Sequence, residues 1–242
     1  MKKITGIFLI SLLLFGCTAQ QIQDSVGAVL GSYSDPTEQE AGQGIKDALG
    51  IGITKGMTLL SATDGFLGND LVKIPWPEQA QTVKDALLKI GMQKQVDNVT
   101  TSLNRAAEKA SGVAIDVFAQ AIRQMTVQDA LQIVLGGNGA ATAYLKKTTT
   151  PILTEKFRPI VDQSLGQVNA TRYWSDATGI YNRIPFVKPV NTDLTGYVTE
   201  KALAGVFKMV EKEENNIRAN PLQRTTELLK KVFSYADRKK QP

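Results

Sequence analysis

Three polar residues in the middle of the chain, Asn104, Arg105 and Glu108, have types and a spacing that could do chemistry. An amide, a guanidinium and a carboxylate about one helical turn apart could orient a polar ligand. Residues at positions i and i+3 of a helix are also neighbours, so Arg105 and Glu108 could equally form a structural pair. We favour the structural interpretation and keep the three residues as a candidate ligand or interface site.

A cluster of carboxylates near the C-terminal end is a second candidate for chemistry. General acid–base hydrolysis of a glycoside needs two carboxyl groups about 5–9.5 Å apart across a cleft. Neighbouring residues of a helix point to different sides, and we therefore expect these glutamates on a solvated face. They are Glu211, Glu213 and Glu214.

Other short motifs are better explained by structure than by ligand binding. The run Gly136-Gly-Asn-Gly139 lacks the Gly-Lys-Ser/Thr end of a phosphate-binding P-loop, and we expect Asn138 to cap the next helix. Asp64-Gly65 and Asn69-Asp70 lack the ligand alternation of a calcium loop and indicate turns. Aromatic residues that we expect in the core rather than in a pocket are Tyr173, Trp174 and Tyr181.

The composition excludes several classes of enzyme. The 242 residues include no histidine and one cysteine, Cys17, which excludes a Ser-His-Asp triad and His- or Cys-ligated metal centres. Ser–Lys dyads and paired carboxylates need no histidine, so enzymatic activity stays an open alternative. We assign no catalytic residue, no cofactor and no metal, and favour a non-enzymatic protein.

The N-terminus has the pattern of a lipoprotein signal peptide. A basic start precedes a short apolar run, Ile4 to Phe15, which is well below the about 20 residues that cross a bilayer. Leu14-Phe15-Gly16-Cys17 then resembles a lipobox, in which the cysteine sulfur receives a diacylglyceryl group. We predict a signal peptide over 1–16 and lipidation, including palmitate, at Cys17.

The remaining chain divides into a tether and one domain. Residues 17–37 are rich in Gln, Ser and Gly and predict a flexible tether, and 38–242 predict an all-helical domain. By resemblance to sorting rules in Gram-negative bacteria, Thr18 after the cysteine indicates the outer membrane, facing the periplasm. Residues 201–242 carry 10 basic and 5 acidic side chains. We predict no nucleic-acid partner, because aromatic and basic residues are not interleaved.

Helical signals dominate, so the predicted fold class is all-α, a multihelical bundle-like domain with at most a minor two-stranded ribbon. Asp35-Pro36 predicts the start of a first helix. Apolar residues from Val96 to Val117 step by three and four and predict one long helix. Separate helices are expected up to Lys147 and from Pro151 to Leu165. The extended stretches that could pair as a ribbon are 70–75 and 183–189.

The C-terminal region predicts two more helices. Asp193 can cap a long helix that ends near Ala219, and Glu214 and Arg218 are spaced as an i,i+4 pair on it. Asn220-Pro221 predicts the start of the last helix. Its expected inward residues are Leu222, Thr225, Leu229, Val232 and Ala236.

Four ordered motifs carry a resemblance to a known family. They are Asp64-Gly-Phe-Leu-Gly-Asn69, Asn104-Arg-Ala-Ala-Glu-Lys-Ala110, the run from Gly136 to Leu145, and Glu213-Glu-Asn-Asn-Ile-Arg218 with Pro221, Arg224 and Thr225 after it. Together they resemble the bacterial lipoproteins of domain-of-unknown-function family 4197. The resemblance implies an all-helical envelope protein and no particular activity.

Three functional hypotheses follow for the domain. The first is a non-enzymatic protein that binds another envelope protein or a cell-wall component, or organises the envelope. The second is a periplasmic carrier of a lipid or other apolar ligand, which predicts an internal cavity. The third is a histidine-independent cell-wall hydrolase, which predicts a cleft with opposed carboxylates.

Overall fold

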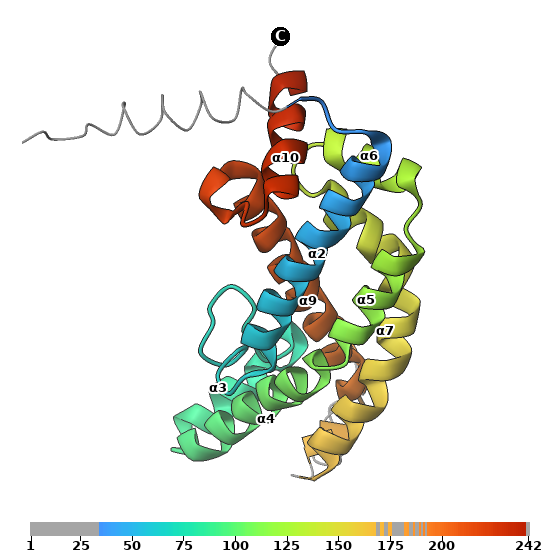
Figure 1. The fold of residues 1–242 in the computed structure, drawn as a ribbon. Coiled ribbons are helices and arrows are strands. Elements are labelled where there is room, and N and C mark those ends of the chain that lie inside the picture. The colour runs from blue at the N-terminus through green and yellow to red at the C-terminus, as the bar shows by residue number, and fades with distance from the viewer. Residues whose placement is uncertain are drawn as a thin grey trace, which may run out of the picture.

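A computed structural model of the chain describes residues 34–167, 170–171, 174–175, 182–183, 186, 189, 191 and 193–240. Throughout these residues the regular structure is helical, which confirms the predicted all-α class (Figure 1). The α-helices are α2 (Glu38–Ser61), α3 (Gln81–Lys89), α4 (Gln93–Ser111), α5 (Ala114–Gln124), α6 (Val127–Leu135), α7 (Ala140–Gly166), α9 (Leu194–Ala219) and α10 (Glu227–Lys240). Short 3-10 turns at Glu78–Ala80 and Pro221–Gln223 precede α3 and α10.

Three long helices organise the domain. Helix α7 packs along α9 and α4, and α2 packs against α6, α9 and α5. Helix α10 packs on α2, so that the start of α2 and the C-terminal helix lie at one end of the molecule, with α3 and α4 at the other (Figure 1). The segment between α2 and α3 covers the side of α4 and α9.

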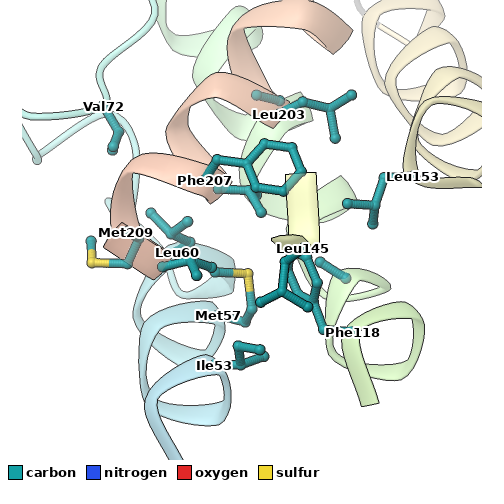
Figure 2. Packing of buried hydrophobic residues seen from close by; sticks show 14 of the residues in the cluster. Ile53, Met57, Leu60, Val72, Phe118, Leu145, Leu153, Leu203, Phe207 and Met209 are labelled. Carbon is teal, nitrogen blue, oxygen red and sulfur yellow. The ribbon is translucent and has the colours of Figure 1, made fainter. Parts of the chain in front are cut away.

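The hydrophobic core is one continuous cluster that all the long helices supply. Met57 and Leu60 of α2 lie beside Phe207 of α9 and Phe118 of α5, all buried (Figure 2). The rings of Phe118 and Phe207 meet edge to face with their centroids 5.9 Å apart, a favoured aromatic geometry. Ala106 and Ala110 of α4 are fully buried, as their place in the apolar series from Val96 to Val117 predicts.

Helix α2 begins two residues later than the proline motif predicts. Thr37, not Asp35, is the N-cap, because its hydroxyl accepts from the Glu40 amide while the Glu40 carboxylate accepts from the Thr37 amide. Lys231 of α10 donates to both carboxylate oxygens of Glu40, at 2.8 and 2.9 Å. The bond from Lys231, followed by the one from the Thr37 amide, lowers the pKa of Glu40 from 4.5 to about 2.

This lowered pKa predicts a contribution to stability that depends on pH. A depressed carboxyl pKa stabilises the fold fully above about pH 4.5, and the contribution is lost as the pH falls towards about 2. We expect Glu40→Gln to lower the melting temperature at neutral pH and to match the wild type near pH 2. Thermal melts across this range test it, with Glu38→Gln of the same turn as control. A difference that is constant with pH would contradict the assignment.

Two helix boundaries differ from the sequence prediction. The expected helix through Val96 and Val117 is broken at Gly112 and Val113 into α4 and α5. The two helices expected around Pro151 are instead one, α7, which continues through Pro151 and Pro159. Its buried stripe, Leu145, Leu153, Phe157, Val161 and Leu165, packs along its length and outweighs the two prolines' helix-breaking tendency.

Other local expectations are also corrected. Residues 70–75 form turns and coil rather than a strand, and most of 183–189 lies outside the described residues. Leu222 is 80% exposed and Thr225 is exposed, because α10 begins only at Glu227, whereas Leu229, Val232 and Ala236 are buried as predicted. The Asp193 cap is confirmed, since its carboxylate accepts from the Gly196 amide at 2.7 Å.

Candidate functional site

Asn104 of α4 binds the segment that follows α2 with the pair of backbone hydrogen bonds that a neighbouring β-strand would otherwise make. The Asn104 oxygen accepts from the Ile74 amide at 2.8 Å, and its nitrogen donates to the Ile74 carbonyl at 3.0 Å. Asn104 and Ile74 are both buried. The side-chain amide of Asn104 therefore satisfies both backbone hydrogen-bonding groups of Ile74. Asn104 has a structural role rather than a ligand-binding one.

Glu108 and Arg105 fix the first part of the same segment. One Glu108 oxygen accepts from the amides of Phe66 and Leu67, at 3.1 and 3.2 Å. Arg105 donates to the other Glu108 oxygen at 2.6 Å and to Asp64 at 2.8 Å. These bonds, with Glu108 first, raise the pKa of Arg105. The pairing of Arg105 with Glu108 that we favoured as structural is present.

Arg105 and Glu108 also border an open cleft, whereas Asn104 does not. The cleft measures about 450 Å³ and lies where α4 meets the ends of α2 and α7. This size falls within the range of small-molecule sites. Carbon atoms contribute more of its exposed surface than oxygens and nitrogens do, but all its lining residues except Ala106 are polar by type: Ser61, Thr63, Thr101, Ser102, Arg105, Glu108, Lys109, Ser164 and Gln167.

Most of the cleft residues have no distinguishing sequence signal. They come from three separate segments, and hydroxyl side chains in helices are common on any solvated face. Ser164 stands out in the structure, because its buried hydroxyl oxygen has no hydrogen-bond partner among the described groups. An unpaired buried hydroxyl costs about 1–3 kcal/mol, which a polar atom placed in the cleft could recover.

A second polar network lies at the other end of the domain, around Glu214 of α9. Its carboxylate accepts from the amides of Ala141 and Thr142 at 3.0 and 2.9 Å, and from the Thr142 hydroxyl at 2.8 Å. Arg218 donates to the same carboxylate at 2.9 Å. Glu214 thus caps the start of α7, where it complements the positive end of the helix.

Arg218 extends this network to α6 and confirms the expected i,i+4 pair. Its guanidinium donates to the carbonyls of Ile133 and Val134, at 2.7 and 3.4 Å, where α6 ends. The side chains of Glu214 and Arg218 are only 4% and 5% exposed. The pair therefore joins α6, α7 and α9 inside the core.

The solvated face predicted for the glutamate cluster is wrong for two of its three members. Glu213 and Glu214 are buried, and Glu213 accepts from Lys55 of α2 at 2.8 Å. Glu211 remains on the surface, where it pairs with Lys208. The prediction of a solvated face failed because α9 packs against both α7 and α2, which leaves little of this helix facing solvent.

Arg224 extends the network of Glu214 and Arg218 beyond the end of α9, and the sequence analysis did not propose it as a site residue. It is 2% exposed and donates to the carbonyls of Ile217 and Arg218, which end α9. It also pairs with Asp237 at 2.9 Å and lies 5.3 Å from the Phe233 ring centre. Its position after Asn220-Pro221 gave the only signal, as part of the family resemblance.

The motifs considered for phosphate and calcium form turns. Gly139 has φ +80° and is the N-cap of α7, so the cap predicted at Asn138 is wrong: α7 obtains its N-terminal acceptor from Glu214 instead. Asp64 has φ +66° in the turn that precedes Phe66. Among the described residues, no group of three or more acidic or cysteine side chains could hold a metal ion.

Of the remaining residues that the sequence analysis singled out, only Trp174 lies among the described residues. Trp174 is 9% exposed and its indole donates to the Asn191 carbonyl, consistent with the expected place in the core. Tyr173, Tyr181 and the predicted lipidation site Cys17 lie outside the described residues. Within the described part, the structure contains no helix with the length and hydrophobicity required to cross a membrane.

The fold and the site define an all-helical domain with a polar surface cleft and two buried polar networks. The chain belongs to the family described as "Protein of unknown function (DUF4197)", whose model matches residues 35–234. The four motifs that carried the resemblance meet in pairs: Arg105 joins the first two, and Glu214 joins the last two. Comparison with curated proteins and with solved structures gave no match.

Proposed function

We propose that this protein is a lipid-anchored, non-enzymatic binding protein of the bacterial outer membrane that faces the periplasm. The signal-like N-terminus and the lipobox pattern ending at Cys17 support the anchor. Two long acyl chains hold a protein on a bilayer far more firmly than one, because each buried methylene adds about 0.8 kcal/mol. The tether of residues 17–37 would leave the domain free to meet partners in the periplasm.

The non-enzymatic proposal rests on the hydrogen bonds of two buried carboxylates, Glu108 and Glu214. Glu108 accepts from two amides and a guanidinium, and Glu214 accepts from two amides, a hydroxyl and a guanidinium. A general acid or base needs an oxygen free to exchange a proton with substrate. Both carboxylates are instead committed to holding helices and loops in place, which favours a scaffold over a hydrolase.

The carrier alternative finds less support in the geometry. An apolar cavity between α2, α7, α9 and α10 measures about 20 Å³. That volume suits a single water molecule and not an acyl chain. We therefore prefer binding at the surface to carriage of an apolar ligand inside the domain.

The anchor is tested by substituting the cysteine. We expect the wild-type chain, expressed in a Gram-negative host, to incorporate labelled palmitate and to fractionate with the outer membrane. Cys17→Ser should abolish the label because the acceptor sulfur is gone. Ser25→Ala, within the same tether, serves as the matched control and should keep the label. Equal labelling of Cys17→Ser and wild type would refute the lipoprotein assignment.

A further inference from the structure

We propose that the cleft between α4 and the ends of α2 and α7 binds a neutral saccharide chain of the kind found in cell-wall glycan. This deepens the proposed function, since the envelope location supplies the source of such a ligand. The residues that form the site all lie in the described part of the chain, and its test uses purified protein. Failure of the anchor and failure of the site are therefore distinguishable.

The chemistry of the lining matches a polyol. Hydroxyls of Thr63 and Thr101 each offer a donor and acceptor sites, and Gln167 adds an amide with both. Ser61 and Ser102 donate their hydroxyl hydrogens to the carbonyls of Thr58 and Asn98, so they offer acceptor sites to a ligand. Sugar hydroxyls need donors and acceptors in the same place, which a purely cationic or purely acidic cleft lacks. Ser164 adds a buried hydroxyl with no partner among the described groups, and a ligand hydroxyl beside it would supply one.

The charge balance disfavours a phosphate or another anion. The guanidinium of Arg105 is already bound by Glu108 and Asp64, which leaves Lys109 as the cation without an ion pair in the described cleft. Helices α2 and α7 both end at the cleft and have no basic residue in their last turns. Their carbonyl ends carry partial negative charge and repel an anion.

The size and shape also suit a short glycan segment. The volume of about 450 Å³ exceeds what one or two water molecules require and falls in the range of small-ligand sites. The cleft is open to solvent, so a long chain could pass through it without its ends being enclosed.

The test is saturation-transfer NMR of the full chain in a sugar-free detergent, with chitotetraose, a β-1,4-linked N-acetylglucosamine tetramer, as the probe. We expect saturable transfer to the sugar protons. Thr101→Trp should fill the cleft and abolish the signal. Ser164→Ala should weaken binding about two- to tenfold, the loss of one hydrogen bond, without lowering the melting temperature of the free protein, because it removes an unpaired buried hydroxyl. Asn98→Trp, exposed on the same helix and outside the cleft, should bind like the wild type.

Three outcomes would overturn the proposal. The first is the absence of saturable transfer from wild-type protein that melts cooperatively. The second is transfer that Thr101→Trp and Ser164→Ala leave unchanged, which would place the sugar elsewhere. The third is binding of inorganic phosphate, detected by line broadening that Thr101→Trp removes, without binding of chitotetraose; the cleft would then be an anion site.

Discussion

Replacing Glu214 with alanine is expected to lower the free energy of unfolding by about 3–5 kcal/mol, the cost of leaving one partner of a buried ion pair uncompensated. Arg218 would remain 5% exposed without its carboxylate. The amides of Ala141 and Thr142 would lose their acceptor at the same time. Urea denaturation of the purified protein measures the change.

The matched control is Glu211→Ala on the same helix. Glu211 pairs with Lys208 on the surface, where such pairs contribute about 0–1 kcal/mol. A loss for Glu214→Ala as small as that for Glu211→Ala would contradict the buried network. The double variant Glu214→Leu with Arg218→Met should recover part of the loss, because an apolar pair removes the unpaired charge.

The sequence predicted the helical class and the pairing of neighbours within a helix, because both depend on local spacing. The cap at Asp193 and the pair of Glu214 and Arg218 each involve residues within one helical turn of each other. The periodicity of buried residues in α9 was also readable, since Leu203, Val206, Val210 and Ile217 repeat at helical intervals and are buried.

Contacts between distant segments could not be predicted in the same way. Glu214 was expected in solvent, because nothing in its own helix shows that the start of α7, more than 70 residues earlier, lacks a capping side chain. The break between α4 and α5 and the continuity of α7 likewise depend on the helices packed beside them. Tertiary packing decides such boundaries over local propensity.

The cleft was found only in part. Arg105 and Glu108 were singled out from their spacing, yet the hydroxyls that complete the cleft come from the ends of α2 and α7. Serine and threonine at helix ends have an ordinary local explanation in capping and turns. Only the packing of α4 against α7 and the end of α2 gathers them into one surface.

The two hydrogen bonds between the Asn104 side chain and the Ile74 backbone predict the second large effect on stability. Asn104→Leu should lower the free energy of unfolding by about 2–6 kcal/mol, because the buried amide and carbonyl of Ile74 would both lose their partner, at about 1–3 kcal/mol each. Asn104→Asp should be at least as destabilising at neutral pH, although it keeps an acceptor for the Ile74 amide, because it places a buried carboxylate against the carbonyl oxygens of Ile74 and Thr100.

This comparison separates the specific amide pairing from simple burial of a polar side chain. If Asn104 were only a poorly placed polar residue in the core, leucine would stabilise the domain by adding apolar burial. If it holds the 62–76 segment, leucine should destabilise it and increase amide hydrogen exchange at Ile74 without affecting α9. Asn98→Ala, an exposed asparagine of the same helix, should change the free energy of unfolding by less than about 0.5 kcal/mol. Unaltered exchange at Ile74 in Asn104→Leu would show that other contacts hold this segment on α4.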